Sequence, residues 1–116
     1  MQSSKLITNN NVDIEKILNA WFSSNTTSGD GVFIKKINEP RRKIIIFIAE
    51  DYYLRINSTL TLTVIVEQTI SQTSVEVVSS GGKEGLLSIS YGAEQSAVDR
   101  VVDFLSVYGF TEIESD

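Results

Sequence analysis

The sequence predicts an α+β domain in which one helix precedes an antiparallel sheet and a longer helix follows it. Apolar residues recur at helical spacing near both ends of the chain and alternate with polar residues over much of the middle. No stretch between the alternating segments is long enough for the helical crossover that parallel strands need. We therefore expect an N-terminal helix, a meander of about five strands, and a long C-terminal helix packed on the sheet in a helix-grip-like arrangement.

The first helix is expected after residues 1–10, a polar and aperiodic segment that we expect to be frayed. Asn9–Asn11 offers side chains that can cap a helix start. The spacing i, i+3, i+4, i+7 and i+8 of an amphipathic helix is then met by Ile14, Ile17, Leu18, Trp21 and Phe22. The stretch 23–31 is rich in turn-forming residues, so the helix ends there.

The strands are predicted from apolar runs and alternation at 32–37, 43–49, 52–56, 59–67, 73–79 and 86–91. Neither face of Lys43–Ala49 is polar, and we expect this strand to be covered on both sides. Thr59–Glu67 alternates, with Leu60, Leu62, Val64 and Val66 toward the core. Residues 69–72 and the pair Gly81-Gly82 are expected to form turns between strands.

The last helix is predicted from one apolar stripe, made of Ala97, Val98, Val101, Val102, Leu105 and Tyr108. Gly109 is expected to end it in the left-handed conformation, with Phe110 folding back onto the helix. The acidic tail 111–116 is expected to be frayed. Residues 1–116 have the length of one domain, and no linker divides them.

The chain contains no histidine and no cysteine, which removes a usual member of most compact catalytic and metal sites. We therefore predict no catalytic residues, no metal site and no cofactor. A formal charge of −5 disfavours a general attraction to nucleic acid or anionic lipid. No apolar run is long enough for a signal peptide or a membrane span, so we predict a cytoplasmic protein without nucleic-acid or membrane partners.

Residues 59–105 resemble a family of small bacterial proteins known only as a domain of unknown function. The resemblance rests on a Ser-Ser-Gly turn, a Gly-Leu strand and an aromatic-Gly-Ala start of the last helix. These features correspond to Ser79, Ser80, Gly81, Gly85, Leu86, Tyr91, Gly92 and Ala93. The resemblance implies a fold and a bacterial cytoplasmic origin, and it implies no activity and no site residues.

The densest group of polar and aromatic residues is Glu50-Asp51-Tyr52-Tyr53 with Arg55. Neighbouring carboxylates beside an arginine are residue types that acid–base chemistry uses. Adjacent strand residues point to opposite faces, however, so Glu50 and Asp51 reach one pocket only if a bulge intervenes. Arg55 is the candidate to grip a carboxylate ligand, with the hydroxyl of Tyr53 or Tyr91 beside it, or else to pair with an acidic side chain.

Two further motifs have an ordinary structural interpretation. The run Ser79–Gly85 offers backbone amides and Lys83 to a phosphate, but Glu84 stands where a phosphate-binding loop needs Ser or Thr, which favours a hairpin turn. The basic triplet Arg41–Lys43, with Lys35 and Lys36, suits an anionic partner. It equally suits a solvated strand end that guards a sheet edge.

Three functions are compatible with this sequence. The first is a non-enzymatic binding or interaction domain that forms a homodimer, because the two-faced strand Lys43–Ala49 needs cover that two helices do not fully supply. The second is a carrier for an apolar or amphipathic small molecule, bound between the last helix and the sheet. The third is an enzyme that uses carboxylate and tyrosine groups.

Overall fold

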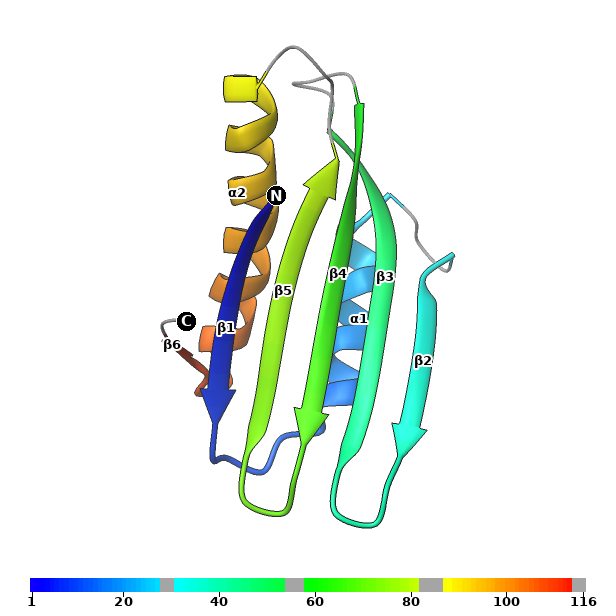
Figure 1. The fold of residues 1–116 in the computed structure, drawn as a ribbon, viewed down its shortest axis with the longest axis vertical. Coiled ribbons are helices and arrows are strands. Elements are labelled where there is room, and N and C mark those ends of the chain that lie inside the picture. Colours follow the sequence, from blue (N-terminus) through cyan, green and yellow to red (C-terminus); the bar gives the residue numbers. More distant parts are fainter. Residues whose placement is uncertain (28–30, 54–57, 82–86, 114–116) are drawn as a thin grey trace.

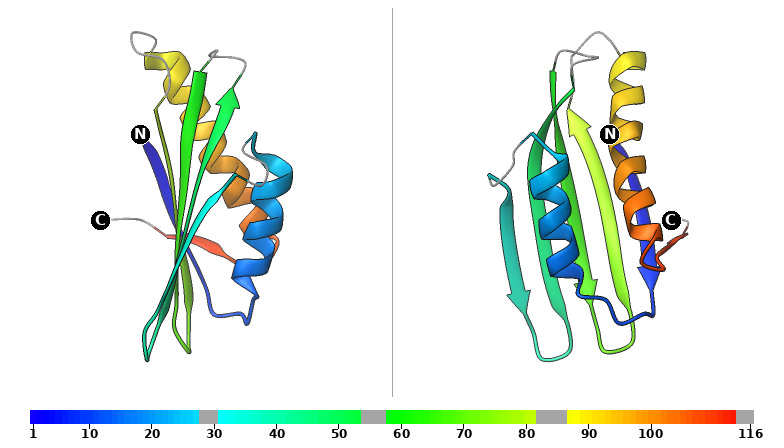
Figure 2. Two further views of the ribbon diagram at one scale, coloured as in Figure 1. Left: turned by 90° about the vertical axis from the view of Figure 1, so that its right-hand side faces the viewer. Right: turned by 180° about the vertical axis from the view of Figure 1, so that it is seen from behind.

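The computed structural model describes residues 1–27, 31–53, 58–81 and 87–113, with only the backbone described at residue 53 and at residues 87–91. Within them, one sheet of six strands carries two helices on the same face (Figures 1 and 2). The elements are, in order, β1 Gln2–Thr8, α1 Ile14–Asn25, β2 Phe33–Asn38, β3 Lys43–Tyr53, β4 Ser58–Gln68, β5 Thr73–Gly81, α2 Leu87–Ser106 and β6 Thr111–Ile113. The α+β class and the C-terminal helix on the sheet are thereby confirmed.

The sheet order is β2-β3-β4-β5-β1-β6, and every neighbouring pair is antiparallel. The four central elements form the expected meander, since β2 to β5 are neighbours in sequence and in space. Residues 69–72 close the β4–β5 hairpin, where the backbone amide of Thr69 donates to the carbonyl of Gln72 at 2.8 Å. Antiparallel pairing follows from the short connections, as predicted.

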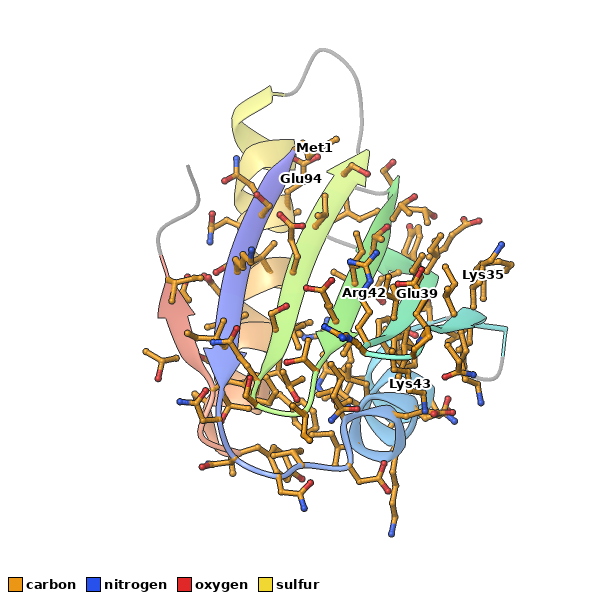
Figure 3. The ribbon with its side chains drawn as sticks, turned by 60° about the horizontal axis from the view of Figure 1, so that its bottom comes forward. Met1, Lys35, Glu39, Arg42, Lys43 and Glu94 are labelled. Carbon is orange, nitrogen blue, oxygen red and sulfur yellow. The ribbon has the colours of Figure 1, made fainter. Side chains whose placement is uncertain are left out.

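The expectation that a helix comes first is wrong, because a strand precedes it. The segment expected to be frayed forms β1, which pairs along its whole length with β5. The amino group of Met1 lies 3.0 Å from a carboxylate oxygen of Glu94 on α2 (Figure 3). At the other end, Thr111–Ile113 forms β6 against β1 rather than fraying. Both terminal strands are stabilised by pairing with residues distant in sequence. Local sequence patterns do not predict such pairing.

The helix α1 includes all residues of the predicted apolar stripe and begins at Ile14. The side chain of the preceding residue, Asp13, accepts a hydrogen bond from the backbone amide of Lys16. Asp13 is therefore the cap, and not the Asn9–Asn11 run. Phe22 stacks on Phe47 of β3, with ring centroids 5.4 Å apart. This stacking places α1 over the β3 side of the sheet.

The helix α2 packs mainly on β5 and β1. The strand predicted at Leu86–Tyr91 is wrong, because α2 already begins at Leu87. The C-terminal cap is confirmed: Gly109 has φ +89°, and the amide of Phe110 donates to the carbonyl of Leu105. The left-handed φ favours glycine at position 109, because other residues are strained in this conformation.

The buried core lies between the helices and one face of the sheet. It takes Ile45, Phe47 and Ala49 from β3. From β4 it takes the four residues predicted to point inward, Leu60, Leu62, Val64 and Val66. The inner face of α2 joins the same cluster through Ala93, Ala97, Val98, Val101 and Leu105.

Candidate functional site

Of the three residues predicted to bind a ligand, Arg55 lies outside the described residues, and so do the side chains of Tyr53 and Tyr91, so their grouping stays a prediction. The backbone of Tyr53 ends β3, where it pairs with Ser58. The backbone of Tyr91 lies in α2 instead of the strand expected there. Gly81 closes β5 with φ +97°, and residues 82–85 of the glycine-rich turn lie outside the described residues.

Asp51 and Glu50 point to opposite faces of the sheet, as predicted for adjacent strand residues. Asp51 is only 3% exposed, whereas Glu50 is exposed. The Asp51 carboxylate accepts from Arg100 Nη1 of α2 at 3.1 Å and from the backbone amide of Thr27 at 3.1 Å. Glu50 and Asp51 therefore do not form a carboxylate pair that could perform acid–base catalysis.

The cation beside Asp51 is Arg100 of α2. Its guanidinium binds Asp51, donates to the carbonyl of Asn25 at the end of α1, and lies 5.5 Å from the centre of the Trp21 ring. A cation that contacts a carboxylate, a helix carbonyl and an aromatic face joins three elements. We interpret this cluster as a structural clamp between α1, α2 and β3.

Sequence reasoning missed Arg100 because this residue lies outside the apolar stripe predicted for the last helix. One signal was present in β3. Asp51 continues the alternation Ile45, Phe47, Ala49 on the buried face, and a carboxylate there needs a cationic partner. The alternation predicts that such a partner exists, but it does not identify it.

Most of the basic residues near the β2–β3 hairpin are neutralised within the chain. Arg42 binds Glu39 and, at 2.7 Å, Glu67, and these contacts raise the pKa of Arg42 (Figure 3). Lys36 and Lys43 both bind Glu15 of α1, at 2.6 and 3.1 Å. These side chains are therefore held by acidic neighbours, which argues against a dedicated anion site.

A shallow hollow of about 440 Å³ lies between the β2–β3 and β4–β5 loops. Pro40, Arg41, Thr69 and Ile70 contribute to its lining. Because it is open and lined by exposed loop side chains, it offers little to orient a ligand. Among the described residues, no group of three or more acidic side chains is placed to hold a metal ion.

The most unusual feature is the face of the sheet opposite the helices, which we call the open face. Figure 1 views the molecule from this side, and Figure 2 shows both helices on the other. Directly paired residues share a face, so the pairing places side chains in cross-strand rows from β2 to β1. The central row is Lys35, Ile46, Ile65, Glu76 and Lys5; the rows on either side are Ile37, Ile44, Glu67, Ser74 and Ile7, and Phe33, Ile48, Thr63, Val78 and Ser3.

Apolar side chains dominate the β2–β3 side of this face. We call the following six residues the apolar patch: Phe33, Ile37, Ile44, Ile46, Ile48 and Ile65. Phe33 is 56% exposed, and the five isoleucines are half-buried by their neighbours in the sheet. No described helix or loop packs over the patch. Water therefore meets a continuous apolar surface, which is typical of an interaction site.

Beyond Ile65, the β4–β5 side of the open face is mainly polar. Thr59, Thr61 and Thr63 lie along β4, and Ser74, Glu76 and Ser80 along β5, with Val78 as the apolar exception. The same sheet thus shows how a solvated face is built, and β3 departs from that pattern. The apolar patch is for this reason our candidate functional site.

Comparison with known proteins gives one match. The model of a family described as "Family of unknown function (DUF6054)" spans residues 2–109. No curated protein and no solved structure matches the chain significantly. The match confirms the predicted resemblance to a small domain family of unknown function. No described helix is long and apolar enough to cross a membrane.

Proposed function

The chain belongs to DUF6054, a family of unknown function, and because membership assigns no activity, we propose from the geometry alone that it is a non-enzymatic interaction domain. It self-associates through the open face, where the apolar patch of one copy is covered by a second copy. The observation that carries this proposal is the position of the two helices on one face, which leaves the patch on β2, β3 and β4 uncovered within the described residues.

The hydrophobic effect favours covering this patch. Each square ångström of apolar surface removed from water contributes about 25 cal/mol. The strands β3 and β4 are eleven residues long and pair throughout, so the patch is held on a rigid surface. A rigid apolar surface loses little conformational entropy on association. A second copy supplies a matching surface, as isologous dimers do.

The carrier hypothesis requires an apolar pocket between α2 and the sheet. The described side chains that meet there belong to one buried cluster, with Ala97, Val98 and Val101 at most 1% exposed opposite Val75 and Val77. Small residues on α2 let the helix approach the sheet closely and fill the layer. This packing supports the interaction hypothesis over the carrier hypothesis. A cytoplasmic location and a bacterial origin stay predictions from the sequence.

Native mass spectrometry together with light scattering tests the proposal. We expect the wild-type protein to be a dimer. Ile46→Glu places a charge at the centre of the patch and is expected to raise the dissociation constant about 100-fold or more, giving monomers at micromolar concentration. Ile70→Glu is the matched control. Ile70 is fully exposed in the β4–β5 turn, away from the open face, so that variant should stay dimeric.

Circular dichroism of each variant shows whether its sheet is intact. Specific self-association is usually detectable at protein concentrations up to about 100 μM. A wild-type protein that is still monomeric at this concentration contradicts the proposal. A folded Ile46→Glu variant that dimerises like the wild type contradicts it too. Loss of the dimer in both isoleucine variants would point to an interface at the hairpin end instead.

A further inference from the structure

The central row of the open face carries opposite charges on β2 and β5, and Lys5 continues the row on β1. Lys35 on β2 is followed by Ile46 on β3, Ile65 on β4 and Glu76 on β5. Three strand spacings of about 4.8 Å separate Lys35 from Glu76, so the two cannot pair within one chain. Neither side chain forms an ion pair with any described residue. The row therefore reads positive, apolar, apolar, negative from β2 to β5.

Such a row is complementary to its own reversed copy. A two-fold axis that runs along the strands, midway between β3 and β4, reverses the strand order and keeps the rows in register. Lys35 of one copy then faces Glu76 of the other, and Ile46 faces Ile65. The two-fold symmetry repeats each contact, so the dimer contains two Lys35–Glu76 pairs. They flank four isoleucines, which are Ile46 and Ile65 of both copies.

The neighbouring rows fit the same axis. Phe33, the most exposed member of the apolar patch, meets Val78 of the second copy, and Ile48 meets the methyl-bearing side chain of Thr63. In the row nearest the hairpin loops, the axis places Ile44 over Glu67 and Ile37 over Ser74 of the second copy. The Glu67 carboxylate is already bound by Arg42 at 2.7 Å and lies at the end of its strand, so the charge that meets Ile44 is paired and at the rim. The contact surface thus has an apolar centre and a polar border, as in known interfaces.

Other two-fold arrangements are less favourable. An axis across the strands places Lys35 on the second copy's Lys35 and Glu76 on its Glu76, which is repulsive. An axis along β3 itself places each Lys35 on Ile65 and buries an unpaired ammonium group. Only the axis between β3 and β4 pairs the two charges. Sheets stacked in this way, about 10 Å apart with strands inclined by about 30°, form an ordinary sandwich.

From this complementarity we infer that two copies stack open face to open face, β3 over β4, with Lys35 of each copy paired to Glu76 of the other. This inference rests on the self-association proposed above and adds its geometry. The strands β1 and β6 lie outside the overlap, so Lys5, which is directly opposite Glu76 on β1, stays free of the second copy.

Charge reversal and mixing test the arrangement. Lys35→Glu and Glu76→Lys each place two like-charged pairs in the homodimer, and each is expected to raise the dissociation constant about tenfold or more. In a mixture of the two variants, the heterodimer has two attractive pairs. The new glutamate at position 35 meets the new lysine at position 76 of the other chain, and the native Glu76 meets the native Lys35. The dissociation constant of the heterodimer is therefore expected to return to within about threefold of the wild-type value. With a tag on one of the two variants, the heterodimer differs in mass from both homodimers, so native mass spectrometry measures its abundance and hence its dissociation constant.

Lys5→Glu is the matched control, because it reverses a lysine in the same row but outside the overlap. It is expected to dimerise like the wild type. Its heterodimer with Glu76→Lys has one attractive and one repulsive pair, so its dissociation constant should lie midway between the wild-type and Glu76→Lys values. Full recovery with Lys5→Glu, in place of full recovery with Lys35→Glu, overturns the arrangement. If Ile46→Glu is monomeric while both charge variants dimerise like the wild type, the arrangement is wrong and self-association through the open face stands. A monomeric wild type overturns both.

Discussion

At the scale of single residues, Asp51 shows how far alternation carries a prediction. The pattern of β3 correctly separates Glu50 from Asp51 and thereby excludes a shared catalytic pocket. Asp51 is buried, yet its cation, Arg100, lies 49 positions away on another element. Strand alternation predicts which face a side chain occupies. It contains no information about which distant residue reaches that face, so it could not identify Arg100.

Removing Arg100 should destabilise the fold more than removing the charge of Asp51. Arg100→Met leaves the Asp51 carboxylate buried without its cation, and we expect a loss of about 2–4 kcal/mol in the free energy of unfolding. Asp51→Asn leaves a guanidinium whose side chain is 40% exposed and can be hydrated, so the expected loss is smaller, about 1 kcal/mol. Urea denaturation followed by circular dichroism measures both values.

Asp103→Asn serves as the control for the Asp51 substitution, because Asp103 is exposed on α2. Its effect should stay within about 0.5 kcal/mol. If Arg100→Met is no less stable than this control, the cluster does not clamp the helices to β3.

At the scale of elements, prediction succeeded where periodicity is long and failed where it is short. The helix α1 and the strands β2, β4 and β5 follow from their patterns, whereas β3 runs unbroken from Lys43 to Tyr53 and so joins segments that were predicted as two strands. In the last helix, Leu86–Tyr91 alternates over only six residues, and so short a run fits a strand as well as a helix turn. Its continuation with Ala93, Ala97 and Val101 at helical spacing is the signal that extends α2 toward the N-terminus. The strand β1 carries no such signal, because residues 3–5 are polar and its pairing with β5 is non-local.

The docking of α1 on the sheet should depend on pH through Glu15. Lys36 of β2 and Lys43 of β3 bind this carboxylate, and they lower its pKa below the ordinary value of 4.5. A lowered pKa in the folded state means that the contribution to stability is present above pH 4.5 and is lost as the pH falls through the lowered pKa.

We therefore expect Glu15→Gln to be less stable than the wild type at pH 7, with the difference shrinking as the pH falls below 4.5 and through the lowered pKa of Glu15. Urea unfolding of both proteins at pH 7 and at a series of acidic pH values measures this. Lys16→Gln is the control, because Lys16 is exposed on the same helix. It should change the free energy of unfolding only slightly and by the same amount at neutral and acidic pH. A Glu15→Gln difference that persists at low pH would contradict an electrostatic role.

At the scale of the whole molecule, the sequence indicates that β3 is apolar on both faces, and the helices and loops that the structure describes cover only one of them. Ile45, Phe47 and Ala49 meet the helices, while Ile44, Ile46 and Ile48 lie on the open face. The pattern of an amphipathic helix shows which side of the helix is apolar, but not which face of a sheet it covers. The placement of both helices on one face was therefore not predictable from local patterns, and it is what defines the candidate site.

If the open face is covered by a second copy, folding and association are coupled, and the melting temperature must rise with protein concentration. With an unfolding enthalpy of about 0.7 kcal/mol per residue for two chains, a tenfold increase in concentration should raise the Tm by about 3 °C. Scanning calorimetry between 5 and 500 μM, about two decades, measures the shift. Ile46→Glu should melt at a temperature that does not depend on concentration, whereas Ile70→Glu should keep the wild-type slope. A wild-type Tm that is the same at all concentrations would mean that the monomer tolerates the apolar patch in water, and that the second face of β3 needs no cover.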